Sequence, residues 1–256
     1  MALPIRLSVL RALFKELSVD ENATLAVGGA RELAPVLRRE LGRDARSGAV
    51  RSDDAPEGAS VFVYVAAADV DKAVLKRARR ARVPIVAVTG DDGDLPFVLA
   101  TDVVRVRPGE GFPIAEIAKR VAARLGEDGA PLAARVPALR GAVADELIRA
   151  FARKNGIVAA AVFIPGADLP VLALNQIRMV LRLEQAYGLD VDPRERAPEI
   201  AATVAAGLGL RALARELLDL VPVAGWAVQG GVAYAGTRAL GEAVVKRLEI
   251  APPGGH

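Results

Sequence analysis

The chain has 256 residues, which is enough for two modest domains or one large domain with a self-sufficient core. It contains no cysteine and a single histidine, His256, so disulfides, thiol chemistry and histidine-rich metal sites are excluded. The formal net charge of +3 permits an anionic partner without requiring one. Hydrophobic residues make up 52% and aromatic residues 4%, so we expect a core built mainly from Ala, Val and Leu.

The first 22 residues combine an apolar stripe with basic residues. Leu3, Leu7, Leu10, Phe14 and Leu17 are spaced alternately by four and three residues, which places them on one side of a helix. Basic residues interrupt the segment and no small-residue cleavage site follows, so we expect a retained amphipathic helix over 1–22. We expect this helix to pack against the rest of the protein or a partner helix, and a membrane-surface helix is the alternative.

Residues 23–127 alternate short apolar runs with helical patterns. The runs are "TLAV" from Thr24, "SVFVYVA" from Ser60, "PIVAVTG" from Pro84 and "DVVRVRP" from Asp102. Continuous apolar strands separated by helices are typical of a parallel sheet. This half is therefore predicted to be an α/β domain with helices on both faces of a small parallel sheet.

The strand pattern ends near residue 127. Residues 128–141 lose periodicity and gather Gly and Pro, so we expect a linker there. Helical patterns then cover 142–164, 168–187, 193–220 and 223–249, which predicts an all-α helical-hairpin domain over 142–250. Residues 251–256 are expected to form a disordered tail.

The glycine pair after the first strand raises the question of phosphate binding. A phosphate-binding loop of the P-loop type needs a lysine and a hydroxyl at fixed distances from its first glycine. Counted from Gly28, the last three positions of that motif are Leu33, Ala34 and Pro35. We therefore interpret Gly28 and Gly29 as a tight strand-to-helix turn, with unconventional nucleotide binding by Gly28, Gly29 and Asp92 as the alternative.

The third apolar run, "PIVAVTGDDGDL", resembles the guanine-reading segment of small GTPases. Aligned by the strand, Thr89 and Gly90 occupy the first two motif positions, and only the aspartate of the motif, Asp92, is kept. The segment 42–59 is too short for switch regions. The first half thus resembles a GTPase-type sheet that is reduced in size and lacks its nucleotide-binding groups.

Two charged segments have alternative interpretations. Asp91, Asp92 and Asp94 follow a strand and could bind magnesium, but a solvated acidic turn is the favoured reading, so no metal site is predicted. The basic run "KRARRAR" at 76–82 lacks interleaved aromatic residues, which favours a solvated helix face over nucleic-acid or lipid contact.

The helical half carries the more specific resemblance. The segments "IPGADLPVLALNQIRMVLRLEQAYG" and "GLGLRALARELLDLVPVAGWAVQGGVAYAGTRALGEAV" are similar to the YcjF-like bacterial domain of unknown function, which commonly follows intact or decayed Era-type GTPase domains. This resemblance implies a GTPase-linked, often membrane-associated accessory module. The residues that match the family pattern are Pro165, Gly166, Asp168, Gln176, Arg178, Tyr187, Gly188, Pro222, Gly225, Thr237 and Gly241.

The helices of this half are unusually apolar. Asp168 is the only charge between Asn155 and Ile177, but proline breaks favour a re-entrant or soluble hairpin over a straight span. Small residues recur every four positions, which predicts close helix packing along this stripe: Ala227, Gly231, Ala235 and Ala239. We expect Asp168 to cap a helix. Buried ion pairs with Asp168, Glu184 or Glu216 are favoured over headgroup contact for the arginines within these apolar helices: Arg178, Arg182 and Arg211.

These features predict a non-enzymatic, two-domain accessory or scaffold protein on the cytoplasmic side of a bacterial membrane. No catalytic residue, cofactor, metal, nucleic acid or firm small-molecule ligand is predicted, and the expected partner is a protein or a second copy. Two alternatives stay open: an unconventional GTP- or ATP-binding protein with residual hydrolysis, and a soluble cytosolic helical scaffold or dimer.

Overall fold

The computed structural model describes residues 22–52, 54–67, 70–91, 93, 95–107, 109–161, 169–189 and 225–250. These residues form two compact units. The α/β unit holds the described residues up to 146 together with 186–188, and the helical unit holds those of 147–185, 189 and 225–250. The predicted helices over 1–22 and 193–220 and the predicted tail at 251–256 lie outside the described residues, apart from Asn22.

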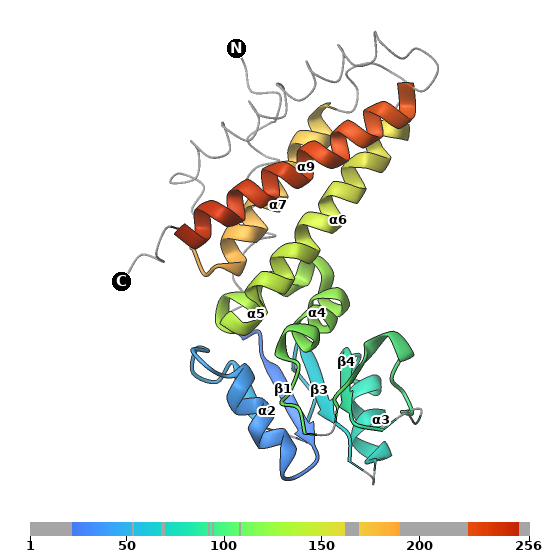
Figure 1. The fold of residues 1–256 in the computed structure, drawn as a ribbon, viewed down its shortest axis with the longest axis vertical. Coiled ribbons are helices and arrows are strands. Elements are labelled where there is room, and N and C mark those ends of the chain that lie inside the picture. Colours follow the sequence, from blue (N-terminus) through green and yellow to red (C-terminus); the bar gives the residue numbers. More distant parts are fainter. Residues whose placement is uncertain are drawn as a thin grey trace. The chain divides into compact units, whose positions relative to one another are not determined.

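A five-stranded parallel sheet forms the centre of the α/β unit (Figure 1). Its strands are β1 (Leu25–Gly29), β2 (Val50–Ser52), β3 (Val61–Val65), β4 (Ile85–Thr89) and β5 (Val103–Arg105), in the order β2-β1-β3-β4-β5. The predicted α/β fold with a parallel sheet is therefore confirmed. Four strands coincide with the apolar runs, whereas β2 is a three-residue strand with no apolar pattern and was not predicted.

The strand register divides the sheet's side chains between two buried faces. Ala26 pairs with Phe62, and every second residue from there points to the face covered by α3 (Lys72–Arg80). The apolar stripe of α3 consists of Val74, Leu75 and Ala78, which pack in one core cluster with Phe62 and Tyr64. Because the chain moves in opposite directions along the sheet after β1 and after β3, right-handed crossovers place α2 (Leu33–Leu41) on the other face.

The crossover from β2 to β3 has no helix within its described residues, 54–60. It passes β1 on the face that α3 covers, because this crossover advances along the sheet in the same direction as the crossover through α3. The face of β1 here carries the small residues Ala26 and Gly28, and Ala59 of the crossover packs in the same buried cluster as Ala26. A short segment of backbone therefore takes the place of a covering helix.

The residues expected as a linker, 128–141, are largely helical in the structure. After α4 (Ile114–Leu125) the chain forms η2 (Gly126–Gly129), α5 (Ala130–Arg135) and η3 (Pro137–Leu139), and α6 begins at Arg140. Leu132 and Leu139 are fully buried. Pro131 and Pro137 lie in the first turn of α5 and of η3, where proline is tolerated. The sequence did not predict these helices because elements this short cannot display a helical period.

Three long helices make up the described helical unit (Figure 1). They are α6 (Arg140–Ala161), whose first turns belong to the α/β unit, α7 (Leu169–Ala186) and α9 (Gly225–Ile250). Each coincides with a predicted helical pattern. Among the described residues, no helix combines the length and the apolar character that crossing a membrane requires.

Candidate functional site

The candidate site of the α/β unit lies where the carboxyl ends of β1 and β3 meet. Chain direction along the sheet reverses between these two strands, because β1 leads through α2 to β2 and β3 leads through α3 to β4. Open α/β sheets bind their ligands outside the carboxyl ends of strands at such a reversal. Gly28 and Gly29, the glycines predicted as a tight turn, lie at this position.

Gly29 is fixed by its approach to the neighbouring strand. It has φ +106°, and a Cβ atom added to it would lie 2.1 Å from the carbonyl oxygen of Val65. Gly28 is buried inside β1, opposite Tyr64 of β3. Close packing of two strand ends is thus sufficient to explain the need for glycine at position 29, without any phosphate.

The chain's own carboxylate and carbonyl oxygens bind the backbone amides of this turn. Gly29 N–H donates to Oδ1 of Asp54 at 3.1 Å, and Ala30 N–H donates to the Val65 carbonyl at 2.8 Å. The amides of Leu33 and Ala34, at the start of α2, donate to the carbonyl of Ala30. In a phosphate-binding loop such amides point to the ligand, whereas here they are satisfied internally.

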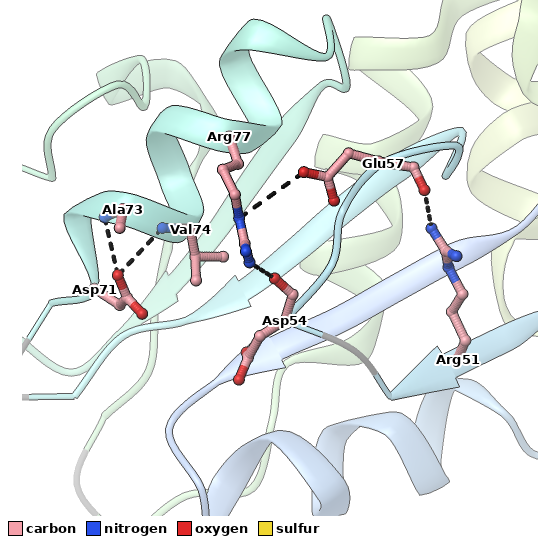
Figure 2. Close-up of polar contacts among 7 residues, drawn as sticks. All are labelled: Arg51, Asp54, Glu57, Asp71, Ala73, Val74 and Arg77. Carbon is pink, nitrogen blue, oxygen red and sulfur yellow. Dashed lines mark hydrogen bonds and ion pairs between the residues drawn. The ribbon is translucent and has the colours of Figure 1, made fainter.

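The start of α3 is also occupied by a carboxylate of the chain (Figure 2). Asp71 is the N-cap, and its Oδ1 accepts hydrogen bonds from the amides of Ala73 at 2.9 Å and Val74 at 3.1 Å. A helix N-terminus attracts anions because its first amides lack partners within the helix. Asp71 therefore satisfies the second place at this sheet edge where an anion could bind.

Arginine side chains hold the crossover that carries Asp54 (Figure 2). Arg77 of α3 donates from Nη2 to the carbonyl oxygen of Asp54, and its Nε lies 3.8 Å from Oε1 of Glu57. Arg51 donates from Nη2 to the carbonyl of Glu57 at 2.6 Å. The Arg77–Glu57 pair is half exposed, so its contribution to stability is small, but together these contacts position Asp54 over Gly29.

Tyr64 connects the buried core to the same sheet edge. Its ring is 1% exposed, and its hydroxyl oxygen accepts a hydrogen bond from the Asp71 amide at 2.8 Å. Burial is the largest influence and raises the pKa of the Tyr64 phenol above its ordinary value of 10.0. The hydrogen bond from the Asp71 amide lowers the pKa by less than burial raises it, and the negative charges of Asp71 and Asp54 raise it further. The phenol is therefore held neutral as a hydrogen-bond acceptor.

The segment that resembles a guanine-reading motif forms a self-contained turn. Thr89 ends β4, is 4% exposed, and accepts a hydrogen bond from the Asp91 amide to its Oγ1 at 3.0 Å. Asp92 and Asp94 lie outside the described residues. No group of three or more acidic or histidine side chains with metal-binding geometry occurs among the residues that the structure describes.

In the helical unit, one residue of the family pattern belongs to a buried polar network. Asn155 of α6 donates from Nδ2 to Oγ1 of Thr237 in α9 at 3.0 Å, and Asn175 of α7 donates to Oδ1 of Asn155 at 2.9 Å. All three side chains are at least 94% buried. This network joins three helices and fixes their mutual register.

Other residues of the family pattern have structural roles or cannot be placed. Gly241 packs against Ile148, since an added Cβ would lie 2.6 Å from its Cγ1, and Gly188 is the left-handed residue that ends α7. Gln176 is buried in α7, while Arg178 and Gly225 lie in α7 and α9. Tyr187 precedes Gly188 at the end of α7. The remaining members lie outside the described residues: Pro165, Gly166, Asp168 and Pro222.

The close approach of α6 and α9 occurs one residue away from the predicted small stripe. An added Cβ on Gly230 would lie 2.9 Å from the carbonyl oxygen of Gly156, whereas one on Gly231 would meet nothing within 4 Å. Ala235 and Ala239 are exposed. The four-residue repeat identified the correct helix, but the close approach to α6 is made by Gly230, one position before Gly231 of the repeat.

Several of these residues were not predicted from the sequence. Asp71 before "KAVL" carries the usual signal of a helix N-cap and could have been found. Asp54 and Arg77 carry no such signal, because their roles depend on how the crossover folds. Glu184, considered as a partner for the arginines of the helical half, is fully buried and pairs with Arg247 of α9 at 3.1 Å.

The structure defines a doubly wound α/β unit, in which Asp54 and Asp71 bind backbone amides at the carboxyl ends of β1 and β3, together with a helical unit. Comparison of the chain with protein-family models, with curated proteins and with solved structures finds no match.

Proposed function

We propose that this protein is a non-enzymatic accessory or scaffold protein whose α/β unit is a nucleotide-incompetent form of a GTPase-type sheet and whose helical part is a YcjF-like module. The observation that supports the nucleotide part of the proposal is the hydrogen bond from the Gly29 amide to Asp54. It places a negative charge where a nucleotide phosphate would need to lie.

Electrostatics strengthens this interpretation. A triphosphate at the carboxyl ends of β1 and β3 would have to displace the carboxylate of Asp54 and approach that of Asp71, which caps α3. In a P-loop a lysine offsets the phosphate charge and a hydroxyl binds magnesium, and Ala34 and Pro35 stand at these two positions. Leu33 replaces the second glycine, and proline offers no amide hydrogen. Repulsion therefore opposes binding, and the usual cation is missing from the loop.

Calorimetric titration with GTP and ATP, each with magnesium, tests the nucleotide part. The wild-type protein is expected to give no binding heat at millimolar nucleotide. Asp54→Ala separates the two causes, because it removes the carboxylate from the Gly29 amide but does not restore the lysine and hydroxyl of a P-loop. This variant should still give no heat. Saturable binding by the wild-type protein would refute the proposal.

We further propose that the helical unit contacts the cytoplasmic side of a membrane. Each of its described helices exposes a large apolar side chain, namely Ile157 in α6 (61% exposed), Val171 in α7 (46%) and Tyr234 in α9 (36%). Peripheral contact of this kind requires no spanning helix.

Flotation of the full chain with vesicles that contain anionic lipid tests this contact. The protein should float, and a high-salt wash should leave most of it bound if apolar contact dominates over charge. A protein that stays in the aqueous fraction and whose mass rises with concentration would instead indicate that these side chains form a contact between copies.

A further inference from the structure

We propose that the side of the sheet where the strands begin, opposite to the ends of β1 and β3, carries a binding site for a small amphiphilic anion. Such a ligand is a carboxylate or phosphate attached to an apolar or aromatic group. A cavity of about 290 Å³ opens there, at the amino end of β4. The residues that line it come from the end of α3, the turn into β4, the segment before β5 and the end of α4.

The cavity carries an excess of positive charge. Arg124 is neutralised by the buried Asp102, with Nε lying 3.2 Å from Oδ2. Within the described part of the chain, neither Arg79 nor Arg82 has an acidic partner, and the guanidinium of Arg79 instead lies 6.0 Å from the centre of the Phe97 ring. Two guanidinium groups are thus available to an oxyanion, which they bind with charge-assisted hydrogen bonds.

An apolar wall adjoins these arginines. Phe97 is 40% exposed and Leu99 is 58% exposed, while Val83 and Ile85, which also line the cavity, belong to the buried core. Exposed apolar side chains beside unpaired cations suit a ligand that has an anionic head and an apolar body. Inorganic phosphate alone would leave the apolar wall uncovered.

The backbone at this cavity is held in an unfavourable conformation. Among the described residues, the non-glycine positions with positive φ are Asp44, Arg82 and Phe97, and two of these three line the cavity. Residues with such strained backbones concentrate at binding sites, where function requires a side chain at that position.

Arg82 illustrates the cost most clearly. The amide of Val83 donates to the carbonyl of Ala78, and the amide of Arg82 donates to that of Arg79, which is the hydrogen-bond pattern of a Schellman helix end. The left-handed position of that motif is usually glycine, whereas here it is arginine with φ +58°. The chain therefore places a guanidinium at the cavity where glycine would be more stable.

The test is a calorimetric titration of the full chain with phenyl phosphate and with benzoate, using inorganic phosphate and benzyl alcohol as controls. Phenyl phosphate is expected to bind at least about tenfold more tightly than either control, because only it combines both chemical features. Binding of benzoate as well would support a general oxyanion site, and binding of phenyl phosphate alone would support a phosphate head. No saturable binding of either probe at millimolar concentration would overturn the proposal.

Three variants assign the binding to this cavity. Arg79→Gln is expected to weaken phenyl phosphate binding by about tenfold. Arg80→Gln removes the same charge from an exposed position on α3 outside the cavity and should leave the affinity unchanged. Arg82→Gly should weaken binding to a similar extent while raising the midpoint of urea unfolding, so that its loss of binding cannot be ascribed to misfolding. Unchanged affinity in Arg79→Gln and Arg82→Gly, or an equal loss in Arg80→Gln, would overturn the proposal.

Discussion

The backbone of Gly29 passes so close to Val65 that a Cβ atom on Gly29 would lie 2.1 Å from the Val65 carbonyl oxygen. The contact is between two backbone segments, so no side-chain rotation can relieve it. Gly29→Ala adds this overlap to the cost of a left-handed backbone and is expected to lower the free energy of unfolding by about 3 kcal/mol or more. Urea unfolding followed by circular dichroism measures the loss.

Gly48 supplies the matched control for this substitution. It has φ +73°, but an added Cβ would meet nothing within 4 Å. Gly48→Ala therefore carries the backbone cost alone, about 1–2 kcal/mol. Equal losses for the two variants would show that the approach to Val65 is not what fixes glycine at position 29.

The contact between α6 and α9 makes opposite predictions for two adjacent glycines. Gly230→Ala would place a methyl group 2.9 Å from the Gly156 carbonyl oxygen and should lower the free energy of unfolding by about 1–3 kcal/mol. Gly231→Ala meets open space inside a helix and should raise it by up to about 1 kcal/mol, because alanine is the better helix former. Thermal unfolding of both variants checks the signs. Unchanged or raised stability of Gly230→Ala would contradict the close approach to Gly156, and destabilisation by Gly231→Ala would contradict the open space at position 231.

Features that repeat along the sequence could be predicted, and features made by single contacts could not. The buried strands β3 and β4 are continuous apolar runs, and α3 carries a clear stripe around Leu75, so pattern alone locates them. β2 has three residues and α5 has six, which is too short for a period to register. The spacing of small residues in α9 also cannot show which of two adjacent glycines contacts α6, and only the structure distinguishes Gly230 from Gly231.

The candidate site shows the same division. The first strand and its glycines point to the ends of β1 and β3, because ligand sites of open α/β sheets lie at strand ends. The group that occupies this edge, Asp54, comes from a crossover whose path depends on Arg77 and on the small residues of β1. Such an interaction joins segments that are distant in sequence, and no local pattern encodes it.

The buried network centred on Asn155 predicts a coupling between two helices. Asn155→Ala leaves the amide of Asn175 and the hydroxyl of Thr237 without their partner, so it should cost about 2–4 kcal/mol of unfolding free energy. Thr237→Val, which keeps the side-chain shape, should cost less. A double-mutant cycle should give a coupling energy of about 1 kcal/mol, and strict additivity of the two losses would contradict a direct hydrogen bond.

The raised pKa of Tyr64 predicts a loss of stability at alkaline pH. A group whose pKa is higher in the folded than in the unfolded state contributes stability that is fully present below the unfolded value, here near 10.0, and is lost as pH rises through the folded value. Wild-type protein should therefore exceed Tyr64→Phe in unfolding free energy by about 1 kcal/mol near neutral pH, where the hydroxyl accepts the Asp71 hydrogen bond. This advantage should shrink above pH 10.0 as the phenol ionises in the unfolded chain and not in the folded one.

Urea unfolding of both proteins over this pH range measures the advantage. The difference in phenolate absorbance between the two folded proteins gives the titration midpoint of Tyr64. An advantage that stays constant with pH, or a midpoint at or below 10.0, would mean that burial does not hold Tyr64 neutral.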